Sequence, residues 1–324
     1  MTMPLEPTLL EEAFELEFSG VVPVVDNPEA LFAVLPEQIV DLIAPRIDEI
    51  EEFKMRFGTK LSVCIDGKYQ NWDYLVTQDD CETDETALMG FRSDGRAGIP
   101  GTIHRISKRP NRYGTTTGLT VRIGRFVKGV AEPLREYLER HVSILMAGPP
   151  GVGKSTLMRD MIRICCEKFG KKGITVDTSG ELAGDGDVPH PALGDSDVMA
   201  VPDPRVQEEI IAMAIKNHNP SIIFVDEIGY NRDAEIIQRA GTKTIKIWAT
   251  AHGSSLKDLA GNTDLDPVLG KPNRETGQNT VDVTFDLLIV VPKKGEYHVY
   301  ENLGRALHDY RAGHEPTPRV LRLN

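Results

Sequence analysis

The sequence predicts an α/β protein in which a helix-covered, mainly parallel sheet follows a smaller α+β domain. From about residue 131, short apolar runs alternate with helical stretches, as expected of a parallel sheet. Before that point, two pairs of alternating segments flank turn residues, which is typical of antiparallel ribbons. The length of 324 residues also exceeds one compact domain. The predicted units are an acidic tail (1–25), an α+β domain with a basic ribbon (26–130), an α/β domain (131–295) and a C-terminal tail (296–324).

The predicted N-terminal domain combines a helical entry with two ribbons. Residues 1–25 are acidic and contain prolines, which suggests a tail or docking segment. Leu and Ile recur at helical spacing over 36–57, so we expect a helix there, interrupted at Pro45. The ribbons pair LSVCID with YQNWDYLV, around an Asp-Gly turn, and TIHRISK with GLTVRIGR.

A basic stretch stands out in an acidic chain. The formal net charge is -12, which disfavours nucleic acid or anionic membrane as a partner of the whole surface. Between Arg92 and Lys128, however, nine basic residues accompany one acid, Asp94. Three interpretations stay open: a solvated face, a phosphate-facing surface at a subunit contact, and a nucleic-acid-binding patch.

The predicted parallel sheet consists of continuous apolar runs, as a sheet covered on both faces requires. These runs are VSILMA, GITVD, SIIFVD, IKIWAT and FDLLIVV. No run is long enough to span a bilayer, and the start of the chain lacks the features of a secretory signal, so we expect no membrane insertion.

A phosphate-binding loop follows the first of these strands. The residues Gly148, Pro149, Pro150, Gly151, Val152, Gly153, Lys154, Ser155 and Thr156 match G-x-x-x-x-G-K-[ST] and open a helical stretch. Glycines let consecutive backbone N–H groups face one anion, and the helix N-terminus adds partial positive charge. Lys154 is expected to reach the β- and γ-phosphates, and the Ser155 hydroxyl to bind Mg²⁺. The sequence therefore predicts a P-loop nucleotide site.

The run SIIFVDEIG ends in two carboxylates. Asp226 is expected to hold Mg²⁺ and Glu227 to orient and deprotonate the attacking water, because phosphoryl transfer depends on positioning more than on covalent help. The run GITVD intervenes between the two motifs, an arrangement that fits the P-loop class with an additional strand and a catalytic glutamate.

Two further side chains follow strand ends near the predicted site. Glu181 lies in the exit loop TSGELAGDGD, with Asp185 and Asp187. It either assists water activation, or binds the water ligands of Mg²⁺, or belongs to a mobile turn. His252 ends the run before Gly253 and is a candidate sensor of the γ-phosphate.

These residues resemble the AAA-type ATPases of cyanobacteria and plastid genomes, which are related to the sporulation stage III ATPase and more distantly to secretion ATPases. The resemblance covers roughly residues 35–291 and depends on FRSDGRAGIPGTIHRIS, GLTVRIGR, GPPGVGKST, VDTSGELAGDGDVPHPALG, VDEIG and ATAHG, in that order. It implies a RecA-like core and ring assembly with ATP between subunits. Glu181 then matches an acidic-box residue and His252 a histidine-box residue.

The resemblance also gives the basic stretch a role. Arg96, Arg105, Arg122 or Arg125 is expected to reach the γ-phosphate of a neighbouring subunit. Many family members continue into a nucleic-acid-binding domain with an Arg-x-x-x-His motif, which we do not expect in this chain.

The first functional hypothesis is a Mg²⁺-dependent ATPase that forms a ring, such as a hexamer, and moves an unknown partner in the cytoplasm or plastid stroma. The alternative is an ATP-controlled switch that binds single-stranded nucleic acid through residues 92–128. A small-molecule kinase is disfavoured because Glu227 beside Asp226 suits activation of water. A GTPase is disfavoured because no Asn-Lys-x-Asp motif, which reads guanine, follows the run SIIFVDEIG.

Overall fold

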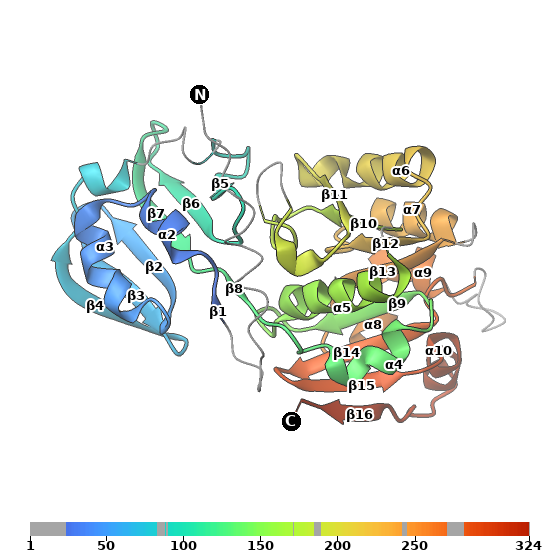
Figure 1. Ribbon diagram of the computed structural model, residues 1–324. Coiled ribbons are helices and arrows are strands. Elements are labelled where there is room, and N and C mark those ends of the chain that lie inside the picture. The colour runs from blue at the N-terminus through green and yellow to red at the C-terminus, as the bar shows by residue number, and fades with distance from the viewer. Residues whose placement is uncertain are drawn as a thin grey trace.

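The computed structural model describes residues 24–82, 88, 90–170, 172–184, 189–241, 245–270 and 282–323. The predicted acidic tail falls outside these residues up to position 23, as do Asp185 and Asp187. A smaller antiparallel sheet and a larger mixed sheet form two bodies, shown on the left and right of Figure 1.

The N-terminal body is a six-stranded antiparallel sheet in the order β4-β3-β2-β7-β6-β5. Its strands are β2 (Ile50–Arg56), β3 (Lys60–Ile65), β4 (Lys68–Leu75), β5 (Arg96–Gly98), β6 (Arg105–Pro110) and β7 (Thr116–Arg122). Both predicted ribbons form, as β3–β4 and β6–β7. Asp66 and Gly67 join the first pair with positive φ angles of 49° and 70°, as a two-residue type I′ turn requires.

The predicted helix over 36–57 is wrong in its second half. Helix α3 (Glu37–Ile43) and a 3₁₀ turn (Ala44–Arg46) end near Pro45, and Ile50–Arg56 is the central strand β2. Phe53 and Met55 are buried and alternate with less buried residues. Ile50 and Phe53 satisfy helical spacing too, which caused the error. Helix α3, with α2 (Pro28–Phe32), contributes to one apolar core with this sheet.

The second body is an eight-stranded sheet in the order β11-β10-β12-β13-β9-β14-β15-β16. Its strands are β9 (Ile144–Gly148), β10 (Gly173–Asp177), β11 (Asp197–Ala200), β12 (Ile222–Val225), β13 (Lys246–His252), β14 (Leu287–Lys293), β15 (Glu296–Tyr300) and β16 (Arg319–Arg322). The five predicted strands are confirmed, and β11, β15 and β16 were not predicted. The first six strands in this order pair in parallel. Strand β13 separates β9 from β12, so the P-loop and the Asp226–Glu227 pair leave strands that are not neighbours.

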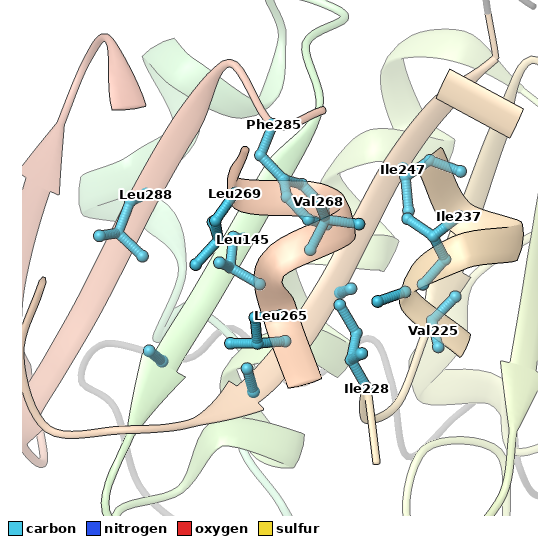
Figure 2. Packing of buried hydrophobic residues seen from close by; sticks show 14 of the residues in the cluster. Leu145, Val225, Ile228, Ile237, Ile247, Leu265, Val268, Leu269, Phe285 and Leu288 are labelled. Atoms are coloured by element: carbon cyan, nitrogen blue, oxygen red, sulfur yellow. The ribbon is translucent and has the colours of Figure 1, made fainter. Parts of the chain in front are cut away.

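Helices cover both faces of this sheet. One face packs on α5 (Lys154–Phe169) and α4 (Arg135–Leu138). The other packs on α6 (Gln207–Asn217), α7 (Asn231–Gly241), α8 (Leu256–Gly261), α9 (Asp266–Leu269) and α10 (Leu303–Arg311). Figure 2 shows this second core, where Leu145, Val225 and Leu288 of three strands lie with Ile237, Val268 and Leu269 of the covering helices.

Residues 296–322 are not a tail, which corrects the prediction. Strand β15 pairs antiparallel with β14, and β16 pairs with β15. Leu303 and Leu307 of α10 are fully buried. Charged residues on the outer side of this segment obscured its apolar residues in the sequence.

The two bodies contact each other through buried polar residues. The short strand β1 (Val24–Val25) pairs with β8 (Arg125–Phe126). The first strand therefore begins two residues before the predicted start of the N-terminal domain at residue 26. Asp26, which follows β1, is 2% exposed and accepts hydrogen bonds from Ile103 N (2.7 Å) and His190 Nε2 (3.1 Å). His190 belongs to the second body, so Asp26 connects the two.

Candidate active site

The P-loop connects β9 to α5 at the carboxyl edge of the sheet. Gly151 and Gly153 have φ angles of 75° and 97°, which L-residues with side chains rarely adopt. A Cβ at Gly148 would lie 2.8 Å from Val291 O, so only glycine fits. The loop thus turns toward the N-terminus of α5, where a phosphate would find backbone donors and the helix dipole.

Lys154 is folded over this loop. Its Nζ donates to Gly148 O (2.9 Å) and Pro149 O (3.3 Å). Burial lowers its pKa, and the nearby acids Glu227, Glu181 and Asp226 oppose that shift. Phosphate oxygens would be stronger acceptors for this ammonium than the two carbonyl groups are.

Asp226 and Glu227 follow β12 and differ in exposure. Asp226 is 6% exposed and accepts a hydrogen bond from the Ser179 hydroxyl. Burial, and then the charge of Asp177, raise the pKa of Asp226. The Glu227 side chain is 43% exposed, and its Oε1 lies 2.8 Å from Nε2 of His252. The candidate sensor therefore contacts the candidate base directly.

Glu181 occupies the centre of the site. Its Oε2 accepts from Ser155 Oγ at 2.9 Å, and its Oε1 lies 2.7 Å from Arg105 Nη1 and 3.5 Å from Arg122 Nη1. Burial opposes ionisation, but the two arginines and Ser155 still lower the pKa of Glu181. The carboxylate thus links the P-loop helix to the N-terminal sheet.

The candidate arginines lie in different surroundings. Arg105 and Arg122 are opposite each other on β6 and β7 and face Glu181 of their own chain. Arg96 on β5 pairs with Asp94 at 3.8 Å. Arg125 donates to the main-chain oxygens of residues 47, 48 and 50, which is a structural role. The structure therefore brings Arg105 and Arg122, but not Arg96 or Arg125, into contact with Glu181.

Sequence reasoning missed the residues that shape the Glu181 loop. Asp177 accepts from the backbone N of Gly180 (2.9 Å), Leu182 (3.1 Å) and Ala183 (2.7 Å). Arg159 of α5 is 5% exposed and donates to Glu181 O at 2.8 Å. A carboxylate closing the strand GITVD, as Asp226 closes its own strand, was the available signal for Asp177.

The donor set suits magnesium better than a softer metal. Ser155, Asp226 and Glu181 offer only oxygen atoms, which Mg²⁺ prefers. In the described ranges no cluster of three or more His, Cys, Asp or Glu could hold a metal ion by itself. Phosphate and water oxygens would have to complete the shell, as expected of a nucleotide-bound ion.

The fold is that of a RecA-like P-loop protein in which an additional strand, β13, lies between β9 and β12. The pilus retraction motor PilT, solved with bound ADP, aligns with a TM-score of 0.58 and 14% identity, over 84% of this chain and 86% of that one. At that identity the similarity shows the shared fold alone.

Residues 81–275 match the family described as Sporulation stage III, protein AA, and the chain belongs to that family. It is 31% identical over 314 residues to the uncharacterized protein ycf45 of Porphyra purpurea, covering 90% of this chain and 55% of that protein. It is 37% identical over 225 residues to the protein SEEDLING PLASTID DEVELOPMENT 1 of Arabidopsis thaliana, covering 69% of this chain and 33% of that protein. The chain thus spans about half or less of these two relatives.

Among the helices of the described ranges, none combines the length and apolar character needed to cross a membrane.

Proposed function

We propose that this protein is a Mg²⁺-dependent ATPase that hydrolyses ATP to ADP and phosphate and works as a ring-forming oligomer. The observation that carries the proposal is the convergence of Lys154, Ser155, Glu181 and the Asp226–Glu227 pair at one sheet edge. The fold is shared with the pilus retraction motor PilT and with the ATPase DotB of Legionella pneumophila, which supports an ATPase that moves or remodels a partner.

The residues divide the chemistry among them. The P-loop backbone and Lys154 bind the phosphates, and Ser155 and Asp226 would hold Mg²⁺, which neutralises charge on the transferred phosphoryl group. Glu227, the more exposed carboxylate, accepts the proton of the attacking water. His252 sets the direction of that carboxylate and senses the γ-phosphate.

Glu181 and the two arginines connect this site to the N-terminal domain. Ser155 would bind Mg²⁺ through its hydroxyl oxygen and could still donate its hydrogen to Glu181 Oε2. Arg105 and Arg122 contact the other oxygen, Oε1, and from there would be able to turn toward bound phosphates. We propose that they act within their own chain, whereas Arg96 is the candidate that reaches a neighbouring subunit. Arginine in such a role contributes on the order of 10³ to 10⁵ in rate.

The structure favours this function over the nucleic-acid switch. Arg92 and Arg125 donate to main-chain oxygens, and Arg105 and Arg122 face Glu181. Four of the nine basic residues over 92–128 thus have partners within the chain. We place the protein in the cytoplasm or plastid stroma, with itself and an unidentified protein as partners.

The test measures ATP hydrolysis and molecular mass across protein concentration for wild type, Lys154→Ala and Glu227→Gln. We expect Lys154→Ala to lose ATP binding. Glu227→Gln should bind ATP but lose roughly 10² to 10⁴ in turnover, the usual contribution of a general base. Lys168→Ala, at the exposed end of α5, is the control.

Specific activity that rises together with mass supports the ring. Normal turnover in Glu227→Gln would refute the assignment of the base. Turnover that changes only when single-stranded nucleic acid is added to a monomer would favour the switch.

A further inference from the structure

A buried glutamine holds the backbone of the candidate base. Gln207, the first residue of α6, is 3% exposed, and its Nε2 donates to the main-chain oxygen of Glu227 at 2.7 Å. Its Oε1 accepts from the hydroxyl of Thr178. The main-chain oxygen of Glu227 needs a donor and the Thr178 hydroxyl here needs an acceptor, so the contacts fix which end of the Gln207 amide faces each of them.

The contact matters because the Glu227 side chain has little else to restrain it. The side chain is 43% exposed and touches His252 at its tip. The backbone before it is fixed from the other side, where the Thr250 hydroxyl donates to Asp226 O. Gln207 and Thr250 together determine where the Glu227 carboxylate can reach.

The same chain of bonds extends into the N-terminal domain. Arg92 Nη2 donates to the main-chain oxygen of Thr178 (2.8 Å) and to that of Val201 (3.2 Å). Arg92 Nε is buried and lies within hydrogen-bonding distance of no partner in the described chain. A buried N–H without a partner costs stability, so this nitrogen offsets part of what the two Nη2 hydrogen bonds contribute.

We propose that Gln207 is a positioning residue for Glu227, and that Arg92 and Thr178 transmit the placement of the N-terminal domain to it. The inference rests on the proposed ATPase function. It gives the N-terminal domain a route to the water-activating carboxylate that is separate from Arg105, Arg122 and Glu181.

The test begins with Gln207→Met, which preserves length and removes both hydrogen bonds. We expect kcat to fall roughly ten- to hundredfold, as for a misplaced catalytic group, while the Kd for ATP stays within about threefold. Gln78→Met is the matched control, because Gln78 Nε2 also donates to a main-chain oxygen, that of Thr116 (3.0 Å), in the N-terminal sheet. It should leave both constants unchanged.

Thr178→Val, alone and combined with Gln207→Met, tests whether the bonds act as one chain. We expect the double variant to be no slower than Gln207→Met, because the Thr178 hydroxyl acts through the glutamine. Should Gln207→Met not fold, Thr178→Val alone must still lower kcat at constant Kd. Additive losses, or equal losses in kcat and ATP affinity, would overturn the proposal.

Hydrogen exchange in the nucleotide-free protein separates this inference from the proposed function. Gln207→Met and Arg92→Met should both accelerate amide exchange over residues 226–230, whether or not the protein hydrolyses ATP. If the wild type has no ATPase activity but both variants still exchange faster than it does, the proposed function is refuted and the chain of contacts stands. Unchanged exchange in Arg92→Met would refute the link to the N-terminal domain.

Discussion

Single residues in the P-loop carry constraints that the motif alone does not explain. Gly148 is the last residue of β9, packed between the Val291 main chain and the Val152 side chain. Gly151 and Gly153 instead have open space and positive φ angles. The first glycine is thus required for close packing, and the other two for backbone conformation.

Gly148→Ala should therefore damage the site by overpacking. The added Cβ would lie 2.8 Å from Val291 O and 2.9 Å from Val152 Cγ1. We expect a loss of about 1–3 kcal/mol in the free energy of unfolding, with weaker ATP binding, measured by urea titration and by calorimetry. Gly261→Ala is the control, because a Cβ at that position would have no neighbouring atom within 4 Å among the described residues. Equal behaviour of the two variants would contradict the packing argument.

The contact of His252 with Glu227 predicts an effect of this single residue on turnover. His252→Ala frees the Glu227 carboxylate, so kcat should fall roughly ten- to hundredfold with little change in the Kd for ATP. His298→Ala removes a similar pair, His298 with Glu296 at 3.0 Å, away from the site. Single-turnover hydrolysis compares the two. An effect of the same size in both variants would remove His252 from the mechanism.

Secondary-structure elements show which parts of the fold could be predicted. The five apolar strands and the P-loop helix were identifiable because each is a local pattern. Strand β2 was not, since Ile50 and Phe53 fit both periodicities and only pairing with β3 and β7 decides between them. Of the C-terminal strands, β15 pairs with β14, which directly precedes it, and only β16 depends on a partner that a helix separates from it along the chain.

The site residues also divide into those that a local sequence pattern identifies and those that only the folded structure reveals. Lys154, Ser155, Asp226 and Glu227 lie in contiguous motifs. The contact of Arg105 with Glu181 and that of Gln207 with Glu227 arise from packing between distant segments, on which the sequence alone carries no local signal.

Helix α5 also anchors the segment that joins the two domains. Asp160 of α5 is 3% exposed, accepts from Gly129 N (2.9 Å) and Ala131 N (2.8 Å), and pairs with Arg163 at 2.7 Å. Asp160→Ala leaves these donors unpaired in a buried place and should cost about 3–5 kcal/mol in the free energy of unfolding.

Glu139→Ala is the control for Asp160→Ala. It removes a partly exposed ion pair with Arg135 and should lower the free energy of unfolding by only about 0–1 kcal/mol. Chemical denaturation of both variants measures the difference. A small loss in Asp160→Ala would mean that the linker amides find other partners.

At the scale of the whole molecule, the two bodies meet at a buried junction around Asp26. His104 Nε2 donates to Asp26 O, and its Nδ1 accepts from Gly124 N at 3.0 Å, so the ring is neutral. His190 Nε2 lies 3.1 Å from Asp26 Oδ1. Burial lowers the pKa of His104. For Asp26, burial opposes ionisation, but the hydrogen bond and charge of His190 still lower the pKa.

Acidification should therefore loosen this junction in two steps. Between the lowered pKa of His104 and its unfolded value of about 6.5, the unfolded chain binds more protons, so stability falls as the pH drops below about 6.5. Asp26 adds a further loss of stability only below the pKa of about 3.9 that it has in the unfolded chain.

His104→Gln keeps a donor and an acceptor but does not titrate. Its free energy of unfolding, measured between pH 7.5 and 5, should fall less steeply than that of wild type, by up to about 1.4 kcal/mol per pH unit. Equal slopes would show that His104 binds its proton as readily in the folded protein as in the unfolded chain, and that the junction does not respond to pH through this residue.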